Sequence, residues 1–228
     1  MLESKLIIKI IKETECRENN ANNTMNVLLT AYFPVALKLR PAALYRLDEF
    51  SKNVCGLSNE EKSIAGEIGL VLIPWTAMNE DLRRPEIDWY FITEKSNKPL
   101  IEKIKNIDID LQGMMELPRV LDYPVCCAKS ATEDSLAGID FDVRGTDHVK
   151  LYRETGRKID PLVYFTWGFT PCKPNCEKAL EKGHRIYSAY LKVDKRVAEA
   201  YKAICEDWIR VMGLIAEEPL YQKVCFCK

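Results

Sequence analysis

Apolar residues recur at helical spacing at both ends of the chain. Over residues 1–15, apolar positions three and four apart alternate with Lys and Glu, which predicts a short amphipathic helix. The same spacing predicts a helix over residues 194–216. The helix before it is expected to begin near Asn175, a residue type that caps helix N-termini well, and to end near Val193. The pattern therefore predicts a C-terminal pair of helices.

Prolines and capping residues divide the first third of the chain into shorter elements. Pro34 argues against one uninterrupted helix across residues 25–39. Pro41 is well placed to open a helix over residues 41–54. Residues 58–61 favour the start of a further helix. The expected buried stripe of that helix is Ile64, Ile68 and Leu72.

Strand signals are few. Trp89–Thr93 is aromatic and β-branched and predicts a strand. The apolar stretch 161–169 predicts a second, buried strand, which would position Cys172 at a site. The segment between Pro74-Trp75 and Arg84-Pro85 is expected to be a loop, and residues 135–150 are expected to be irregular. The predicted fold class is thus α+β and helix-rich, with one or two short strands and the C-terminal helical pair.

Length and composition are those of a soluble globular protein. The chain has 228 residues, of which 47% are hydrophobic and 29% charged, enough to bury a substantial core. We expect a single domain over residues 1–228, with an N-terminal module over 1–110 and a cysteine-site module over 111–228 as the alternative.

Charge and hydropathy limit the partners. The net charge of −1 provides no general attraction for nucleic acid or an anionic membrane surface, so neither is expected as a partner. No apolar run approaches the roughly 20 residues of a transmembrane helix. The apolar N-terminal stretch is interrupted by Lys9 and lacks a small-residue cleavage site after it. A cytoplasmic protein is therefore expected.

The nine cysteines are the main chemical signal. An odd number in a reducing compartment argues against a complete set of disulfides and favours metal binding or thiol chemistry. Two pairs stand out, Cys126-Cys127 and the Cys172 and Cys176 pair, which is stiffened by prolines. A helix starting near Asn175 favours the thiolate form of Cys176. Together the pairs supply four thiolates, the number that tetrahedral zinc or an iron–sulfur cluster needs.

Several chemistries fit these four thiols. We expect foremost an iron–sulfur cluster, held by Cys126, Cys127, Cys172 and Cys176. Its role would be electron transfer, sulfur or cluster handling, or support of a larger metalloenzyme assembly, which would be the protein partner. The alternative is structural zinc, or simple burial of the thiols, in a non-catalytic interaction protein. A third hypothesis is a thiol redox enzyme with Cys176 as nucleophile and Cys172 as resolving thiol. The radical-SAM pattern is excluded because Ala179 occupies the place of its third cysteine.

Weaker ligand candidates lie outside the two pairs. Cys225 and Cys227, near the C-terminus, would complete or replace ligands if the tail folded over the site. His148 lies between the cysteine pairs and is a candidate ligand or proton shuttle. His184 is expected about two turns beyond Cys176 on a similar face of its helix.

The two cysteine segments together resemble an uncharacterised, largely archaeal and bacterial family. Residues 117–127, LPRVLDYPVCC, precede residues 171–177, PCKPNCE. The family pattern is an aromatic-Pro-x-Cys-Cys segment followed by Pro-Cys-x-x-x-Cys-Glu at the start of a helix. The likeness covers about residues 117–190 and departs from the pattern at Asp122, where glycine is common, and at Thr170, where histidine is common. It implies that the two segments belong together and carries no assigned activity.

Overall fold

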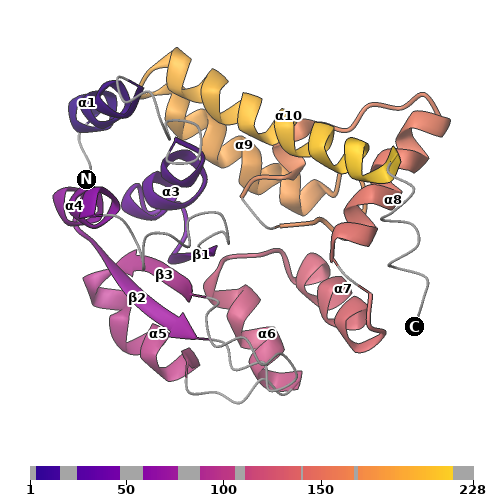
Figure 1. Cartoon of the computed structure of the whole chain (residues 1–228), viewed down its shortest axis with the longest axis horizontal. Coiled ribbons are helices and arrows are strands. Elements are labelled where there is room, and N and C mark those ends of the chain that lie inside the picture. Colours follow the sequence, from indigo (N-terminus) through magenta and orange to yellow (C-terminus); the bar gives the residue numbers. More distant parts are fainter. Residues whose placement is uncertain are drawn as a thin grey trace. The chain divides into compact units, whose positions relative to one another are not determined.

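The computed structural model describes residues 4–15, 25–46, 59–76, 88–105, 111–139, 141–166 and 169–217. It divides the chain into two compact units, Met1–Asp122 and Tyr123–Lys228, which are considered separately (Figure 1). Among the described residues, no helix is both long and apolar enough to cross a membrane.

The first unit contains a three-stranded antiparallel sheet in the order β1-β3-β2. The strands are β1 (Ala42–Arg46), β2 (Leu70–Thr76) and β3 (Asp88–Glu94). Phe91 pairs with Leu44 on one side and Ile73 on the other. Phe91 and its neighbour Ile92 point to opposite faces of the sheet and are both fully buried, so both faces are covered at this position. This confirms the strand predicted over residues 89–93.

Short helices accompany the sheet. They are α1 (Ser4–Glu15), the π-helical turn η1 (Leu28–Tyr32), α3 (Phe33–Ala36), α4 (Asn59–Glu67), the 3-10 turn η3 (Lys95–Asn97), α5 (Lys98–Lys105) and α6 (Leu111–Val120). The helix predicted over residues 1–15 is confirmed. The wider π turn breaks the α-helical hydrogen bonding just before Pro34, whose ring is incompatible with a regular α-helical turn there.

Three expectations for the first unit are wrong. Pro41 is followed by β1 rather than a helix, because Ala42 and Ala43 are buried in pairing with β3; residues 47–58 lie outside the described part. The helix at Ile64 ends at Glu67, since Gly69 adopts a positive φ of 77° and turns the chain. The loop predicted from Pro74 to Pro85 is wrong at its start, where residues 74–76 belong to the strand β2; residues 77–87 lie outside the described part.

The second unit is helical. Its elements are α7 (Val125–Leu136), α8 (Phe141–Glu154), the 3-10 turn η4 (Pro161–Val163), α9 (Glu177–Leu191) and α10 (Lys195–Glu217). The C-terminal pair α9 and α10 is present as predicted, joined by a short turn (Figure 1). Tyr190 and Tyr201 pack edge to face between them at a centroid distance of 5.3 Å. The α+β, helix-rich class is confirmed.

Two expectations for the second unit are wrong. Residues 141–154 form α8, not an irregular segment. This helix buries a small and polar face, including Gly145 and His148, so hydrophobic periodicity does not reveal it. The predicted strand 161–169 has no strand partner: its described part is η4 followed by irregular chain. Residues 162–166 and Phe169 are nevertheless buried, and the Tyr201 hydroxyl donates to the Phe165 carbonyl at 2.8 Å.

Candidate metal centre

Four thiols meet within the second unit. The Sγ atoms of Cys126, Cys127, Cys172 and Cys176 all lie within 4.8 Å of one another and form a group that could hold a metal ion. Cys176 is in contact with the other three, at an Sγ–Sγ distance of 3.7 Å in each case. The Sγ atoms of Cys126 and Cys127 are 3.9 Å apart. The two cysteine segments predicted to meet therefore do meet.

The first turn of α7 gathers the adjacent cysteines. Pro124 precedes the helix with extended backbone (ψ 134°), and its carbonyl accepts from the Cys127 and Ala128 amides. Cys126 and Cys127 are then the second and third helical residues. Extended backbone would point their side chains to opposite sides, whereas helical backbone separates them by only about 100° of rotation. Both sulfur atoms can consequently reach one point beyond the helix N-terminus.

The other two cysteines lie on the turn that leads into α9. Asn175 adopts a left-handed conformation with φ 51°, and Cys176, not Asn175 as predicted, is the N-cap residue. The Asn175 side chain holds the turn in place instead: its Oδ1 accepts from the Asp160 amide at 2.6 Å and its Nδ2 donates to the Lys158 carbonyl at 3.0 Å. The Cys172 amide donates to Cys127 Sγ at 3.4 Å, which joins this turn directly to α7.

An aromatic cluster lies at the base of both cysteine segments. Tyr123 stands just before the proline that opens α7, and Phe169 stands three residues before Cys172. The Phe169 ring lies 5.0 Å from that of Tyr123 and 4.5 Å from that of Phe165. Apolar packing of these rings brings segments more than forty residues apart into contact.

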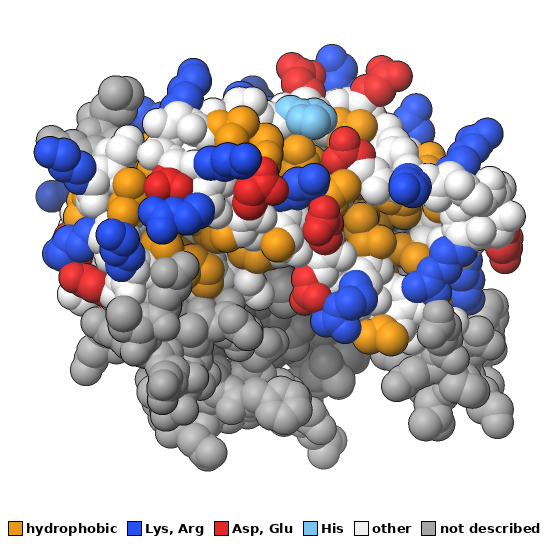
Figure 2. All heavy atoms as spheres, turned by 90° about the horizontal axis from the view of Figure 1, so that it is seen from above, with side chains coloured by type: hydrophobic (Ala, Val, Ile, Leu, Met, Phe, Trp, Pro, Cys, Tyr) orange, Lys and Arg blue, Asp and Glu red, His pale blue; other side chains and the backbone are white. Residues whose placement is uncertain are grey.

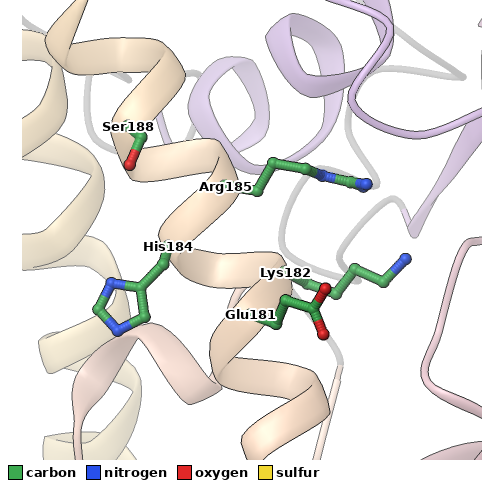
Figure 3. Close-up of a pocket in the computed structure, with 5 residues that line it drawn as sticks. All are labelled: Glu181, Lys182, His184, Arg185 and Ser188. Carbon is green, nitrogen blue, oxygen red and sulfur yellow. The ribbon is translucent and has the colours of Figure 1, made fainter.

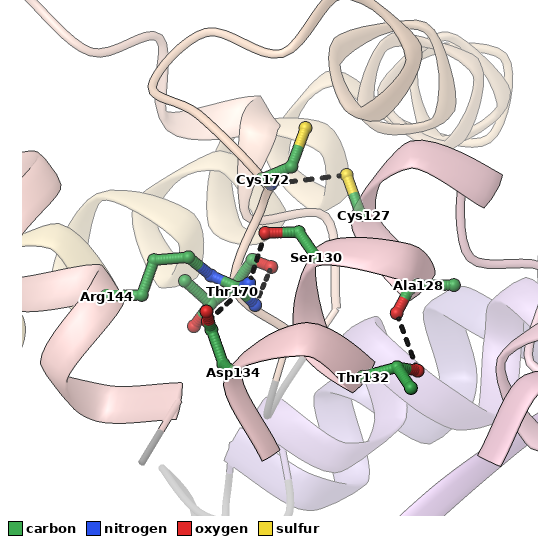
Figure 4. A network of polar contacts seen from close by, with 8 residues as sticks. All are labelled: Cys127, Ala128, Ser130, Thr132, Asp134, Arg144, Thr170 and Cys172. Atoms are coloured by element: carbon green, nitrogen blue, oxygen red, sulfur yellow. Dashed lines mark hydrogen bonds and ion pairs between the residues drawn. The ribbon is translucent and has the colours of Figure 1, made fainter. Parts of the chain in front are cut away.

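Arg144 of α8 connects the same two segments (Figure 4). Its guanidinium forms an ion pair with Asp134 at 2.7 Å, donates to Ser130 Oγ at 2.7 Å and donates to the Thr170 carbonyl at 3.3 Å. Ser130 and Asp134 belong to α7, whereas Thr170 lies two residues before Cys172. Sequence reasoning missed Arg144, since an arginine in a stretch expected to be irregular gives no signal of burial.

Burial and mutual proximity shape the acidity of the thiols. Burial raises the pKa of Cys127 well above 9.0. The hydrogen bond from the Cys172 amide acts to lower this pKa, and the neighbouring thiols act to raise it further. Burial and the contact with Cys176 raise the pKa of Cys172 to about 11. Burial also acts to raise the pKa of Cys176, but the Ala179 amide and the other thiols outweigh it, so this pKa is lowered. In the absence of a metal ion, Cys127 and Cys172 thus retain their protons at neutral pH, and a bound ion would displace them.

The weaker candidates do not join the cluster. His148 is buried in α8 and is not part of the thiol group. Burial, with a smaller contribution from the Arg144 charge, lowers the pKa of His148 to about 4. His184 is exposed and lies 3.7 Å from an Asp160 carboxylate oxygen. Cys225 and Cys227 lie outside the described residues.

A hollow on α9 is lined by residues outside the thiol group. Its volume is about 340 Å³, and its lining residues are Glu181, Lys182, His184, Arg185 and Ser188. In Figure 3, the side chain of His184 points to one side of α9, whereas those of Glu181, Lys182 and Arg185 point to the other. On the face shown in Figure 2, basic and acidic side chains are interspersed with apolar atoms.

Comparison with known proteins finds relatives without an assigned activity. Residues 82–202 match the model of the DUF483 family, described as a protein of unknown function. An uncharacterized protein of Methanocaldococcus jannaschii, MJ1106, is 28% identical over 105 residues, which are 43% of this chain and 54% of the relative. The chain therefore spans about half the length of that relative. No solved structure matches the chain.

Proposed function

The chain belongs to the DUF483 family of proteins of unknown function, and we propose from its thiol chemistry that it binds one tetrahedral metal ion. The proposed ligands are Cys126, Cys127, Cys172 and Cys176, and the proposed ion is zinc. Its role is structural: it joins the N-termini of α7 and α9 and the turn between Thr170 and Cys176. The bound ion would supply four metal–thiolate bonds and displace the protons that Cys127 and Cys172 hold without it.

The spacing of the sulfur atoms carries this proposal. Four thiolates at about 2.3 Å from a central zinc ion form a tetrahedron whose edges are about 3.8 Å long. The four closest Sγ–Sγ distances are 3.7, 3.7, 3.7 and 3.9 Å. Only small side-chain adjustments are needed to bring the remaining two pairs, which lie within 4.8 Å, to the same spacing.

The same spacing favours a single ion over a four-iron cluster. In such a cluster each thiolate binds a different iron, so the whole cluster separates the sulfur atoms much further than one ion does. The adjacent cysteines are expected to bind one ion because α7 directs both to the same point. A mononuclear iron site with four thiolates has the same geometry as the zinc site, so the metal itself must be measured.

A thiol enzyme with Cys176 as its nucleophile is less well supported. Cys176 is only 2% exposed, and its sulfur contacts three other thiols. Four protein ligands also leave no open coordination position of the kind that catalytic zinc uses. The arrangement therefore favours a closed structural site over a catalytic one.

Metal analysis of the full chain after anaerobic purification tests the proposal. We expect one zinc ion per chain, a colourless protein, and strong visible absorption after cobalt substitution, typical of tetrahedral thiolate ligation. Cys127→Ser should lose most of the metal, whereas Cys205→Ser should keep it, because Cys205 is buried in α10 outside the cluster. Iron with acid-labile sulfide, or a protein without metal, would overturn the single-zinc proposal.

A further inference from the structure

The four thiols of the centre differ sharply in exposure. Cys127 and Cys176 are each 2% exposed, and Cys172 is half-buried. Cys126 is exposed, and it follows Val125, whose side chain is 77% exposed. Of the four cysteines, Cys126 is therefore the most accessible to a molecule that arrives from solvent.

The sulfur of Cys126 also differs in its hydrogen bonding. Cys127 Sγ accepts the Cys172 amide, and the Ala179 amide stabilises the Cys176 thiolate. Within the described part of the chain, the polar contacts of Cys126 Sγ are with other thiols, and no backbone amide donates to it. Donated hydrogen bonds draw electron density from a metal-bound thiolate, so a thiolate without them is the stronger nucleophile.

We propose that Cys126 is a modification site of the loaded centre, at which hydroperoxides oxidise the thiolate and so release the metal. This inference rests on the proposed metal site and identifies which of its ligands reacts. It is drawn from exposure, contacts and chain geometry.

The reaction proceeds in two balanced steps. The Cys126 thiolate attacks one oxygen of hydrogen peroxide, the O–O bond breaks, and a sulfenic acid and a hydroxide ion form. A second thiolate then attacks the sulfenic sulfur, a disulfide forms, and a second hydroxide leaves. The two thiolates together lose two electrons, and peroxide gains them. The metal ion loses two of its four ligands and dissociates.

Geometry selects Cys176 as the second thiolate. Its Sγ lies 3.7 Å from Cys126 Sγ. Cys127 is nearly as close, but the Cα atoms of adjacent residues are only about 3.8 Å apart. That separation is shorter than the roughly 4.4 Å minimum usual for a disulfide. A disulfide between Cys126 and Cys176 would link the first turn of α7 to the N-cap of α9.

Stoichiometric hydrogen peroxide added to the zinc-loaded full chain tests the inference. A chromophoric chelator measures zinc release, and mass spectrometry with fragmentation locates the disulfide. We expect one zinc ion released per disulfide between Cys126 and Cys176, and recovery of the loaded centre after dithiothreitol and zinc. A disulfide between Cys172 and Cys176, or peroxide treatment that leaves zinc bound, overturns the inference.

Two ligand variants separate the reacting thiol from the general loss of a ligand. Cys126→Ser and Cys172→Ser each leave three thiolates. Cys172→Ser should still form the disulfide between Cys126 and Cys176. Cys126→Ser should release zinc about tenfold more slowly than Cys172→Ser, because Cys127 and Cys176 are buried and Cys172 is half-buried. Equal rates for the two variants would contradict the inference.

Limited alkylation of the loaded wild-type chain gives the same answer if either variant fails to bind zinc. Iodoacetamide should label Cys126 before Cys172, and should leave Cys205, which is 1% exposed, unlabelled as an internal control. Labelling of Cys172 first overturns the inference. Zinc is measured before oxidation, so a chain without zinc refutes the proposed function and this inference together, while a loaded chain that reacts elsewhere refutes this inference alone.

Discussion

Individual residues at two helix starts give the thiol cluster its geometry. Cys126 and Cys127 share the first turn of α7, and Cys176 is the N-cap of α9. Helix N-termini carry a partial positive charge that favours thiolates. Ala179 occupies the position of the third cysteine of the radical-SAM pattern, and its backbone amide acts to lower the pKa of Cys176.

The backbone conformation of Asp122 accounts for one departure from the expected sequence pattern. Asp122, where the resemblance leads us to expect glycine, has a positive φ of 56°. Glycine adopts that conformation without strain, and aspartate is among the few other residues that tolerate it. The residue turns the chain just before the aromatic residue Tyr123 and the proline that opens α7.

Arg144 is predicted to be a positioning residue for the metal centre. Arg144→Gln removes the ion pair with Asp134 and the bond to the Thr170 carbonyl, which hold α7 and the cysteine turn together. We expect zinc affinity, measured by competition with a chelator, to fall about 10–100-fold, as for other residues that support metal ligands. The cobalt spectrum should also change, which reports distorted ligation.

A matched substitution controls for the loss of an arginine. Arg210 pairs with Asp207 on the exposed surface of α10, so Arg210→Gln should bind zinc as the wild type does. Arg144→Lys should recover part of the affinity, because one ammonium group can replace only some of the three contacts. Unchanged affinity in Arg144→Gln would show that Arg144 does not position the ligands.

His148 is predicted to make the fold sensitive to mild acid. Its pKa is about 4 in the folded chain and 6.5 in the unfolded chain, so between these values only the unfolded chain gains the proton. The contribution of His148 to the unfolding free energy is intact above pH 6.5. It falls by about 1.4 kcal/mol per pH unit below that value, to a loss of about 3 kcal/mol near pH 4.

Comparison of wild type with His148→Gln isolates this effect. Unfolding free energies of both chains are measured from pH 7.5 to pH 4 by urea denaturation at the same metal loading. The wild type should lose stability more steeply between pH 6.5 and 4. Parallel curves would mean that His148 is protonated equally in both states.

At the scale of elements, α9 is positioned by a close approach to η4. A Cβ atom at Gly183 would overlap the backbone carbonyl of Leu162. This approach places the start of α9, and with it Cys176, beside the buried segment that carries Phe165 and Phe169. The glycine is therefore required by packing, although it lowers the helix propensity of α9.

Gly183→Ala tests that packing. The added methyl group must push α9 away from a rigid backbone, so we expect a loss of unfolding free energy of about 1–3 kcal/mol. Ser188→Ala introduces the same residue on an exposed position of the same helix and should change stability by at most about 0.5 kcal/mol. Thermal unfolding measures both. Stabilisation by Gly183→Ala, as helix propensity alone predicts, would show that the contact with Leu162 is absent.

At the scale of the whole molecule, all four thiols belong to the second unit, Tyr123–Lys228. A metal ion there would cross-link segments that the chain separates by more than forty residues. Its free energy of binding would add to the stability of this unit, because the unfolded chain has no preformed site. The sheet of the first unit contains none of the ligands.

Removal of the metal is predicted to loosen the second unit selectively. After chelation, amide hydrogen exchange should accelerate in α7, in residues 169–176 and in the first turns of α9. Exchange in β3 should stay unchanged, and added zinc should restore the original pattern. Equal acceleration in both units, or none in either, would contradict a local structural role for the metal.

Local chemical signals in the sequence determined the two cysteine segments, their meeting in space and the C-terminal helical pair. The structural role of cysteine pairs, prolines and regularly spaced apolar residues can be inferred from a few neighbouring positions in the sequence. The tertiary structure decided which residues lie around the thiols. The helix α8 and the Arg144 contacts arise from long-range packing of small and polar residues, which leaves no hydrophobic period in the sequence. The number of metal ions that the thiols can share likewise depends on sulfur–sulfur distances, and those exist only once α7 and the turn before α9 are packed together.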